Sequence, residues 1–194
     1  MPLPVIERIA TPRLVLRPVV AGDLPDLLEV NGDPEVTRFL PYATWRSPDD
    51  AAAWLERMDT LAAAGDARQL VLVRAADARV VGTLLLFRHD AGSARAEVGY
   101  VLGRRHWGQG LMREALQAAC LHAFGALGLR RLEAEVHPGN AASWRLLERL
   151  GFVHEGTLRQ RWGAQGAPYD TRLYGRLAGD RGGPADGHED ARCR

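Results

Sequence analysis

The stretch that decides the fold is GRRHWGQGLMREAL, residues 103–116. Two arginines come early in it, glycines occupy positions 108 and 110, and an amphipathic helix pattern follows. Glycines at a strand-to-helix turn let the backbone approach a ligand closely, and the first N–H groups of a helix attract negative charge. The stretch therefore predicts an anion site suited to phosphate. The alternative is a tight turn whose arginines are simply solvated.

Length and composition indicate one globular domain. The 194 residues are 46% hydrophobic and 25% charged with a net charge of +1, so neither nucleic acid nor membrane is expected as the main partner. We expect no membrane helix and no secretory signal. Cys120 and Cys193 suggest neither disulfides nor metal ligation, which favours a reduced, cytoplasmic compartment. All 25 basic residues are arginine, which excludes Schiff-base and Walker-type lysine chemistry.

Hydrophobic periodicity and capping residues predict a strand, two helices, three strands, a helix, a strand, a helix and two strands. The strands are expected at 13–18, 69–75, 79–88, 94–103, 130–138, 152–162 and 169–178. The helices are expected from an Asp23 cap to Gly32, at 48–64, from 111 to an end at Gly128, and from an Asn140 cap to Gly151. This order describes a mixed α/β sheet with at least one right-handed βαβ crossover. One domain is expected over residues 1–178, followed by a disordered tail at 179–194.

The spacing Arg105-His-Trp-Gly108-Gln109-Gly110 resembles the pyrophosphate-binding motif of the GNAT superfamily of acyl-CoA N-acyltransferases, Arg/Gln-x-x-Gly-x-Gly/Ala. AEVGYVL (96–102) is similar to the strand before that motif, and HPGNAASWRLLERLGF (137–152) to the strand and helix after it. TPRLVLRP (11–18) and YDTRLYGRL (169–177) resemble the RimJ/RimL-like subgroup of ribosomal-protein N-terminal acetyltransferases. The likeness covers about residues 10–177. It implies a GNAT-like fold: a central, mostly antiparallel twisted sheet with a splayed central strand pair and about four helices.

The resemblance implies acetyl-CoA as co-substrate, with no metal. The pyrophosphate of the co-substrate would rest on the backbone of Arg105, His106, Trp107, Gly108, Gln109, Gly110 and Leu111. Its pantetheine arm would pair with Val101 and Leu102, much as an added strand does. A backbone N–H near Val101 would polarise the thioester carbonyl. Asn140 caps a helix in any case, and the resemblance adds a contact to the CoA arm.

Glu97 is the candidate general base. It lies four residues before Val101 on the same strand, so both residues face the same side. The expected nucleophile is an amine, which must lose a proton either directly to Glu97 or through water. The alternative is a surface carboxylate paired with Arg95 or Arg113.

Ser143 is the candidate general acid for the leaving thiolate. Many relatives offer a tyrosine on the helix before Leu-Gly-Phe, and that position is Leu147 here. The resemblance to the RimL-like subgroup puts Ser143 in the role instead. The alternative is a hydroxyl that bonds to backbone at the start of a helix.

The acceptor is expected to enter over the loop 38–47, where Phe39, Tyr42 and Trp45 would line the entrance or form a simple lid. No acidic cluster in the sequence argues for a polycationic acceptor, so peptide N-termini and small amines stay open. His137 has no partner at metal-ligand spacing.

Three functions compete. The favoured one is an acetyl-CoA-dependent N-acetyltransferase in which a primary amine attacks directly within a ternary complex. The second is a non-catalytic acyl-CoA sensor, supported by the missing helix tyrosine. The third, an ATP- or NAD-binding protein, would need a lysine or a third glycine that the sequence lacks. The resemblance also suggests a homodimer.

Overall fold

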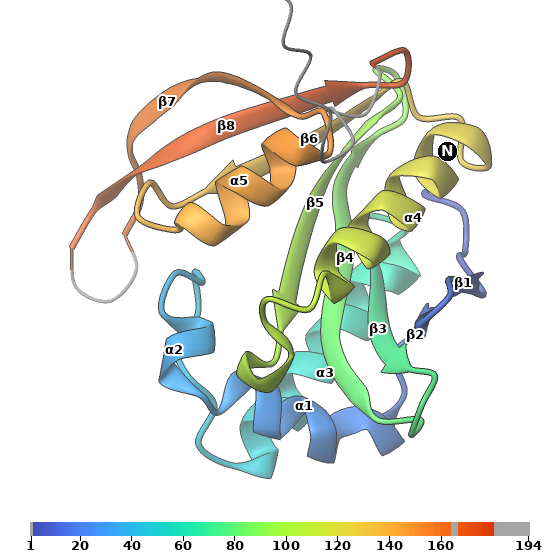
Figure 1. Cartoon of the computed structure of the whole chain (residues 1–194), viewed down its shortest axis with the longest axis vertical. Coiled ribbons are helices and arrows are strands. Elements are labelled where there is room, and N and C mark those ends of the chain that lie inside the picture. The colour runs from blue at the N-terminus through green and yellow to red at the C-terminus, as the bar shows by residue number, and fades with distance from the viewer. Residues whose placement is uncertain (1, 164–166, 181–194) are drawn as a thin grey trace, which may run out of the picture.

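The structure, a computed structural model, describes residues 2–163 and 167–180. Within these residues eight strands form one sheet in the order β1-β2-β3-β4-β5-β6-β8-β7 (Figure 1). The strands are β1 (Ile9–Ala10), β2 (Leu14–Pro18), β3 (Arg68–Arg74), β4 (Val80–Asp90), β5 (Arg95–Leu102), β6 (Arg131–Val136), β7 (Val153–Trp162) and β8 (Tyr169–Leu177). The helices are α1 (Leu24–Asn31), α2 (Pro34–Thr37), α3 (Pro48–Ala64), α4 (Leu111–Gly125) and α5 (Ala141–Arg149).

The centre of the sheet is the one place where neighbouring strands run parallel. β5 and β6, which α4 connects, pair only from Arg95 to Glu97 and from Arg131 to Glu133, while every other neighbouring pair is antiparallel. Beyond these residues β5 continues to Leu102 and β6 to Val136, and the two strands diverge (Figure 1). The expected splayed pair in a mostly antiparallel sheet is thus confirmed.

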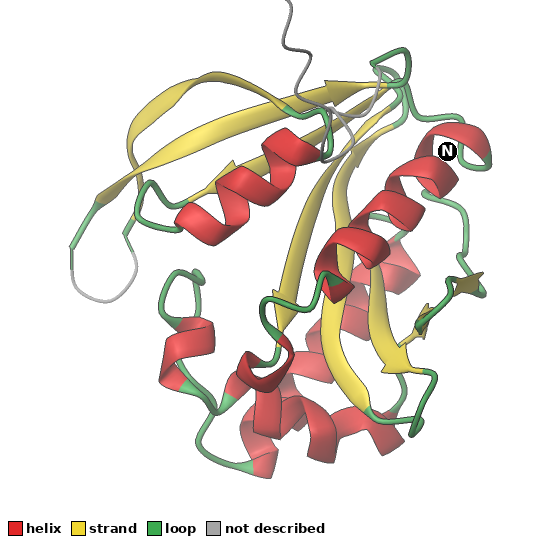
Figure 2. Ribbon diagram, viewed as in Figure 1, coloured by secondary structure: helices red, strands yellow, loops and turns green. Residues whose placement is uncertain are grey.

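Helices cover both faces of the sheet (Figure 2). α4 and α5 bury their apolar sides in the main core, which contains Leu72, Leu116 and Leu147. α1 and α3 enclose a second core on the opposite face, around Val71 and Trp54. Because alternate residues of a strand point to opposite faces, neighbours such as Val71 and Leu72 belong to different cores. The gap between β5 and β6 therefore opens between two packed layers.

Most predicted elements are confirmed, and the differences have local causes. α2 is a fifth helix, a single turn that begins at Pro34 in a stretch between the first predicted helix and the loop 38–47; the Asp33 carboxylate caps it by accepting from Glu35 N–H. Asp23 stands at the N-cap position of α1, as predicted, but its side chain makes no capping hydrogen bond, because its carboxylate accepts instead from Val20 N–H and from Arg17.

The predicted end of α4 was also wrong, and strand β1 was not predicted. α4 ends at Gly125 rather than at Gly128, because the N–H groups of Ala126 and Leu127 both bond to the carbonyl of His122. Of the predicted tail, Gly179 and Asp180 form a turn in which Leu177 N–H bonds to the Asp180 carboxylate over 2.8 Å. Residues 181–194 lie outside the described residues.

Candidate active site

Residues 103–110 form the turn from β5 into α4. Arg104–His106 make a single 3-10 turn, and Gly108 and Gly110 have φ angles of 72° and 73°. Glycine adopts this left-handed region without steric cost. Gly110 is the N-cap of α4, so the first N–H groups of the helix, which lack acceptors within it, open onto the turn. The turn has the backbone and the dipole of an anion site.

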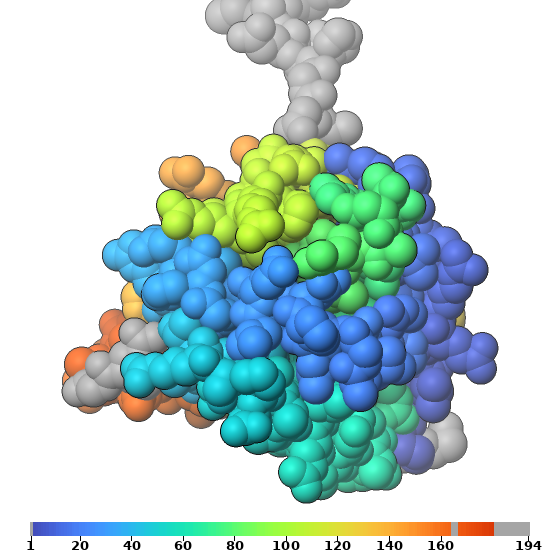
Figure 3. All heavy atoms as spheres, turned by 90° about the horizontal axis from the view of Figure 1, so that it is seen from below, coloured from blue at the N-terminus to red at the C-terminus, as the bar shows by residue number. Residues whose placement is uncertain are grey.

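Side chains fix the shape of this turn. Arg13 donates to the Gln109 carbonyl oxygen over 2.8 Å and to the Glu114 carboxylate over 2.7 Å. The Gln109 side chain donates to the Arg105 carbonyl oxygen over 2.8 Å. The turn lies beside α1 and the β3–β4 turn (Figure 3), where the exposed Arg105 guanidinium is 3.8 Å from the Glu29 carboxylate. The Arg105 charge is therefore at the surface, and Arg13, whose contacts with the turn the sequence does not reveal, holds the turn in place.

His106 and Trp107 lie within the turn and behave differently. The Nδ1 atom of His106 is buried and has no hydrogen-bond partner in the described part of the chain; burial lowers the pKa of this imidazole. The Trp107 side chain is 47% exposed, and its indole N–H donates to the Leu102 carbonyl oxygen over 2.7 Å. Trp107 thereby ties the turn to the end of β5.

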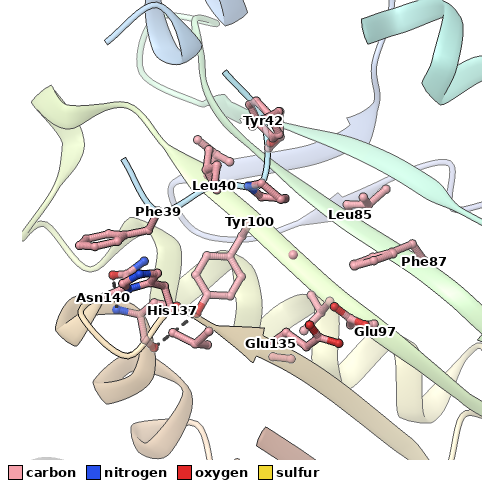
Figure 4. Close-up of a pocket in the computed structure, with 18 of the residues that line it drawn as sticks. Phe39, Leu40, Tyr42, Leu85, Phe87, Glu97, Tyr100, Glu135, His137 and Asn140 are labelled. Carbon is pink, nitrogen blue, oxygen red and sulfur yellow. Dashed lines mark hydrogen bonds between the residues drawn. The ribbon is translucent and has the colours of Figure 1, made fainter. Parts of the chain in front are cut away.

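A cavity of about 290 Å³ occupies the gap between β5 and β6. Residues from both faces of β5 line it, with Glu97 and Val101 on one face and Tyr100 on the other. Figure 4 shows Tyr100 pointing toward the α5 end of the cavity, near Asn140, with Glu97 at the opposite end. The cavity therefore joins the two faces of the sheet.

At the α5 end two hydroxyl groups meet. The Tyr100 hydroxyl is 2.8 Å from Ser143 Oγ, and burial raises the pKa of this phenol. Asn140 caps α5, as predicted, by accepting from Ser143 N–H over 3.2 Å. Ser143 thus faces β5 from the first turn of the helix, and its hydroxyl contacts a side chain rather than only local backbone.

At the other end Glu97 is 7% exposed, so the alternative of a surface carboxylate is wrong. Its Oε2 atom lies 2.6 Å from Nη1 of Arg88 on β4. Burial raises the pKa of Glu97 to about 7, an effect that Arg88 opposes and that Glu135 and Glu133 reinforce. A carboxylate with such a pKa exchanges protons near neutral pH, which suits a general base.

The structure also assembles an acidic group that the sequence did not reveal. Glu133 lies beside Glu97 in the parallel register. Glu135, two residues further along β6 and beyond the end of the pairing, lines the cavity with Glu97 (Figure 4). The Glu135 carboxylate accepts from Trp162 Nε1 over 2.7 Å and from Arg88 over 3.1 Å. The sequence does not reveal that Glu97, Glu133 and Glu135 lie close together, because they come from two different strands.

The sequence profile of the acetyltransferase (GNAT) domain matches residues 13–153. The chain belongs to the GNAT family of acetyltransferases. It is 34% identical over 172 residues to the uncharacterized N-acetyltransferase p20 of Bacillus licheniformis, covering 89% of this chain and 97% of that protein. These matches show that the chain is an N-acetyltransferase.

Solved structures show the same fold. Mycobacterium smegmatis RimJ in complex with CoA-disulfide superposes with a TM-score of 0.78 at 24% identity, covering 89% of this chain and 88% of that one. Spermidine N-acetyltransferase from Vibrio cholerae, in complex with CoA and spermine, gives 0.77 at 22% identity, covering 88% and 98%. Acetyltransferases of the GNAT family use acetyl-CoA, and both of these neighbours hold CoA.

In this acetyltransferase the register of β5 revises one expectation about the CoA arm. Gly103 N–H bonds to the Val81 carbonyl of β4, and Val101 lies opposite Thr83 in the same ladder. Because backbone groups alternate in direction along a strand, those of Val101 point to β4, and those of Leu102 and Tyr100 point to the open edge. The side chain of Val101, rather than its backbone, faces the cavity.

The loop 38–47 brings two of its three aromatic side chains to the cavity. Phe39 and Tyr42 line the cavity, but Trp45 is buried and packs on Trp54 with ring centroids 5.4 Å apart. The His137 ring lies between Phe39, at 4.9 Å, and Tyr169, at 4.6 Å. His137 is thus part of an aromatic wall.

In residues 2–163 and 167–180, no group of three His, Cys, Asp or Glu side chains is arranged to hold a metal ion. No helix in these ranges has the length and apolar character needed to cross a bilayer.

Proposed function

We propose that this enzyme binds acetyl-CoA in the gap between β5 and β6 and transfers the acetyl group to a primary amine by direct attack in a ternary complex. The observation that carries the proposal is the single cavity with Glu97 at one end and the Tyr100–Ser143 hydroxyl pair at the other. Amine and thioester can then meet within the gap, with a base for one and a proton donor for the other.

The turn from Arg105 to Leu111 binds the pyrophosphate in this proposal. Its two left-handed glycines and the start of α4 supply N–H groups to phosphate oxygens without side chains in the way. His106, Trp107 and Gln109 contribute through their backbone, and Trp107 and Gln109 also hold the turn in shape. Arg105 adds positive charge at the surface.

The open edge of β5 aligns the pantetheine arm. The backbone groups of Tyr100 and the N–H of Leu102 point into the gap and pair with the amides of the arm as an added strand does, while the Leu102 carbonyl already accepts from Trp107. An N–H group at this edge also polarises the thioester carbonyl as charge develops on its oxygen. Asn140, which lines the cavity, contacts the arm from α5.

The chemistry moves three protons, two away from the nitrogen and one to the sulfur. The acceptor ammonium gives one proton to Glu97, directly or through water, and the neutral amine attacks the carbonyl carbon. A C–N bond forms, the C–S bond breaks, and the nitrogen loses a second proton. Ser143, supported by Tyr100, donates a proton to the thiolate and regains one from the nitrogen, so one proton in total, the one that Glu97 takes, leaves for solvent. The missing helix tyrosine does not argue for a sensor, because Leu147 is fully buried in the main core and β5 supplies a phenol instead.

The acceptor is a peptide N-terminus or a small amine. A cytoplasmic location belongs to the same proposal, supported by the free, buried Cys120 thiol. The homodimer stays a prediction.

Incubation with acetyl-CoA tests the proposal. Thiol release is followed across a panel of amines and N-terminal peptides, and the acceptor is checked by mass for one added acetyl group. Release that depends on an acceptor and falls sharply in Glu97→Gln supports the proposal. Acetyl-CoA binding without transfer to any member of a broad panel contradicts it.

A further inference from the structure

One arginine nitrogen lies between the two carboxylates of the cavity. Nη1 of Arg88 is 2.6 Å from Glu97 Oε2 and 3.1 Å from Glu135 Oε1. The carboxylate side chains are 9% and 8% exposed, whereas that of Arg88 is 41% exposed. The cationic side chain thus reaches in from the surface, and the anions are fixed inside.

Two irregularities in the sheet bring cations to this point. The β4–β5 register shifts between Phe87 and Asp90, and Arg88 has a φ of 51°. β7 is irregular between Leu158 and Trp162, where Gln160 has a φ of 48°. Left-handed conformations are unusual for residues with side chains. They redirect Arg88 and the pair Arg161 and Trp162 toward Glu135.

The surroundings of the Arg88 guanidinium suit any organic cation. Its central carbon lies 5.5 Å from the centroid of the Phe87 ring and 5.7 Å from that of Trp162. Aromatic faces attract ammonium groups as well as guanidinium groups. Two carboxylates and two rings therefore surround the position that the Arg88 guanidinium occupies, and such surroundings suit an organic cation.

A second observation points to a ligand in the same place. Thr171 of β8 lines the cavity and is 1% exposed, and its hydroxyl has no hydrogen-bond partner in the described part of the chain. A buried hydroxyl without a partner is costly. Glu135 lies opposite Leu173 in the β6–β8 register. Thr171 is therefore the diagonal neighbour of Glu135 on the same face, with their Cβ atoms about 7 Å apart.

We propose that Glu135 and Thr171 form the acceptor subsite, with Glu135 binding the ammonium group and Thr171 a hydrogen-bonding group next to it, and that Arg88 holds this place until the acceptor displaces it. The inference rests on the proposed function. It assigns the acceptor a positive charge and a polar atom within a few bonds of the amine. Glu97, beside the same ammonium, then receives its proton.

The displacement follows from charge. Glu97 and Glu135 face Arg88 from β4 and Arg161 from β7, so two negative charges meet two positive ones. Glu133 adds a carboxylate nearby but is paired with Arg95 and Arg131. An added ammonium is one cation too many in a buried site. Arg88 is the cation in its way, because Arg88 contacts both carboxylates and is 41% exposed, whereas Arg161, which is 45% exposed, contacts Glu135.

NMR on the full chain tests the subsite without turnover. The Trp162 indole N–H, which donates to Glu135, is the reporter, and the variant Trp162→Phe assigns its resonance among the five tryptophans. The probes at pH 7 are glycinamide, which has an ammonium and a carbonyl, ethylammonium, and glycolamide, the neutral analogue. Glycinamide is expected to shift the resonance saturably, with an affinity about tenfold or more above that of glycolamide, as for a charged partner in a buried site.

The variants separate the roles. Glu135→Gln should weaken both cationic probes about tenfold, whereas Glu133→Gln, the matched exchange two residues away, should leave both within about twofold. Thr171→Val should weaken the binding of glycinamide but not that of ethylammonium, and it should not lower the thermal stability of the protein. Arg88→Gln should raise the affinity for ethylammonium at pH 8, because the competing cation is gone. Arg88→Lys, which keeps the charge, should leave this affinity unchanged.

Equal affinity for glycinamide and glycolamide, or weaker ethylammonium binding in Arg88→Gln, would overturn the inference. Thiol release from acetyl-CoA is measured on the same samples. Acetyl transfer without charge-selective binding would refute the subsite but not the proposed function. Charge-selective binding without transfer to any amine would refute the proposed function but not the cation site.

Discussion

Exchanging Glu97 for glutamine should stabilise the protein at pH 8 and stop most of its turnover. Burial raises the pKa of Glu97 from 4.5 to about 7. Between these values the folded state keeps a proton that the unfolded state has lost, so the free energy of unfolding falls as pH rises through this window. Each pKa unit corresponds to about 1.4 kcal/mol, so above pH 7 the ionised carboxylate costs about 3 kcal/mol. Glutamine has the shape of the neutral acid and avoids this cost.

Urea unfolding of both proteins at pH 5 and pH 8 measures the effect. The stability difference, variant minus wild type, should grow by about 2 to 3 kcal/mol between the two pH values. Changes in packing or in the contact to Arg88 contribute at both pH values and largely cancel. Glu133→Gln is the control, since it removes a carboxylate paired with Arg95 and Arg131 and should show no gain at pH 8.

Turnover completes the prediction. Loss of a general base typically lowers kcat by about 10²- to 10⁴-fold, and in this variant the loss should accompany higher stability, which excludes unfolding as its cause. A stability difference that does not change with pH would refute burial as the origin of the raised pKa. Unchanged kcat would refute the base.

Three further predictions concern the rest of the site. The pH profile of kcat/KM should rise with an apparent pKa of about 7, since the base must be ionised, and Arg88→Gln should move this limb to higher pH because Arg88 favours the charged form of Glu97. Tyr100→Phe and Ser143→Ala should each lower kcat by about tenfold with little change in the acetyl-CoA KM, and together by less than the product, because the two hydroxyls act as one unit; steady-state kinetics of the three proteins checks this. Gly110→Ala forces a side chain into a left-handed conformation at φ 73°, a strain of about 1 to 2 kcal/mol, and calorimetry should show weaker CoA binding by about tenfold.

Local sequence was enough where a helix boundary depends on its own caps. α3 begins at Pro48 and ends at Ala64, as predicted. Its start is fixed by the Asp50 carboxylate, which accepts from the N–H groups of Arg46 and Ser47, and its end by Gly65 with φ 79°. All of these contacts span four residues or fewer. The end of α4 depended on competing carbonyls in its last turn, which spacing alone does not reveal.

The catalytic neighbourhood was only half predictable, for a topological reason. Glu97 and Ser143 could be placed because each lies beside a motif with a fixed position in the fold. Glu135 and Arg88 carry no such motif, and they meet Glu97 only because β4, β5 and β6 are adjacent in the sheet. Arg88 also sits at an irregularity, and an alternating pattern of residues does not show where a strand departs from its register.

The splay between β5 and β6 explains both the space for a ligand at this site and the unfavourable burial of its two carboxylates. Pairing ends at Glu97 and Glu133, and the open edge beyond them is the room that an extended acyl donor requires. The same opening leaves Glu97 and Glu135 buried among apolar side chains, and fully paired strands would have excluded the cavity. A buried carboxylate is costly unless a cation accompanies it, and in this structure Arg88 contacts both carboxylates while Arg161 adds a second cation at Glu135. An acceptor that brings its own positive charge can take this position. In the proposed subsite, the ion pair that stabilises the resting enzyme also selects what the enzyme acetylates.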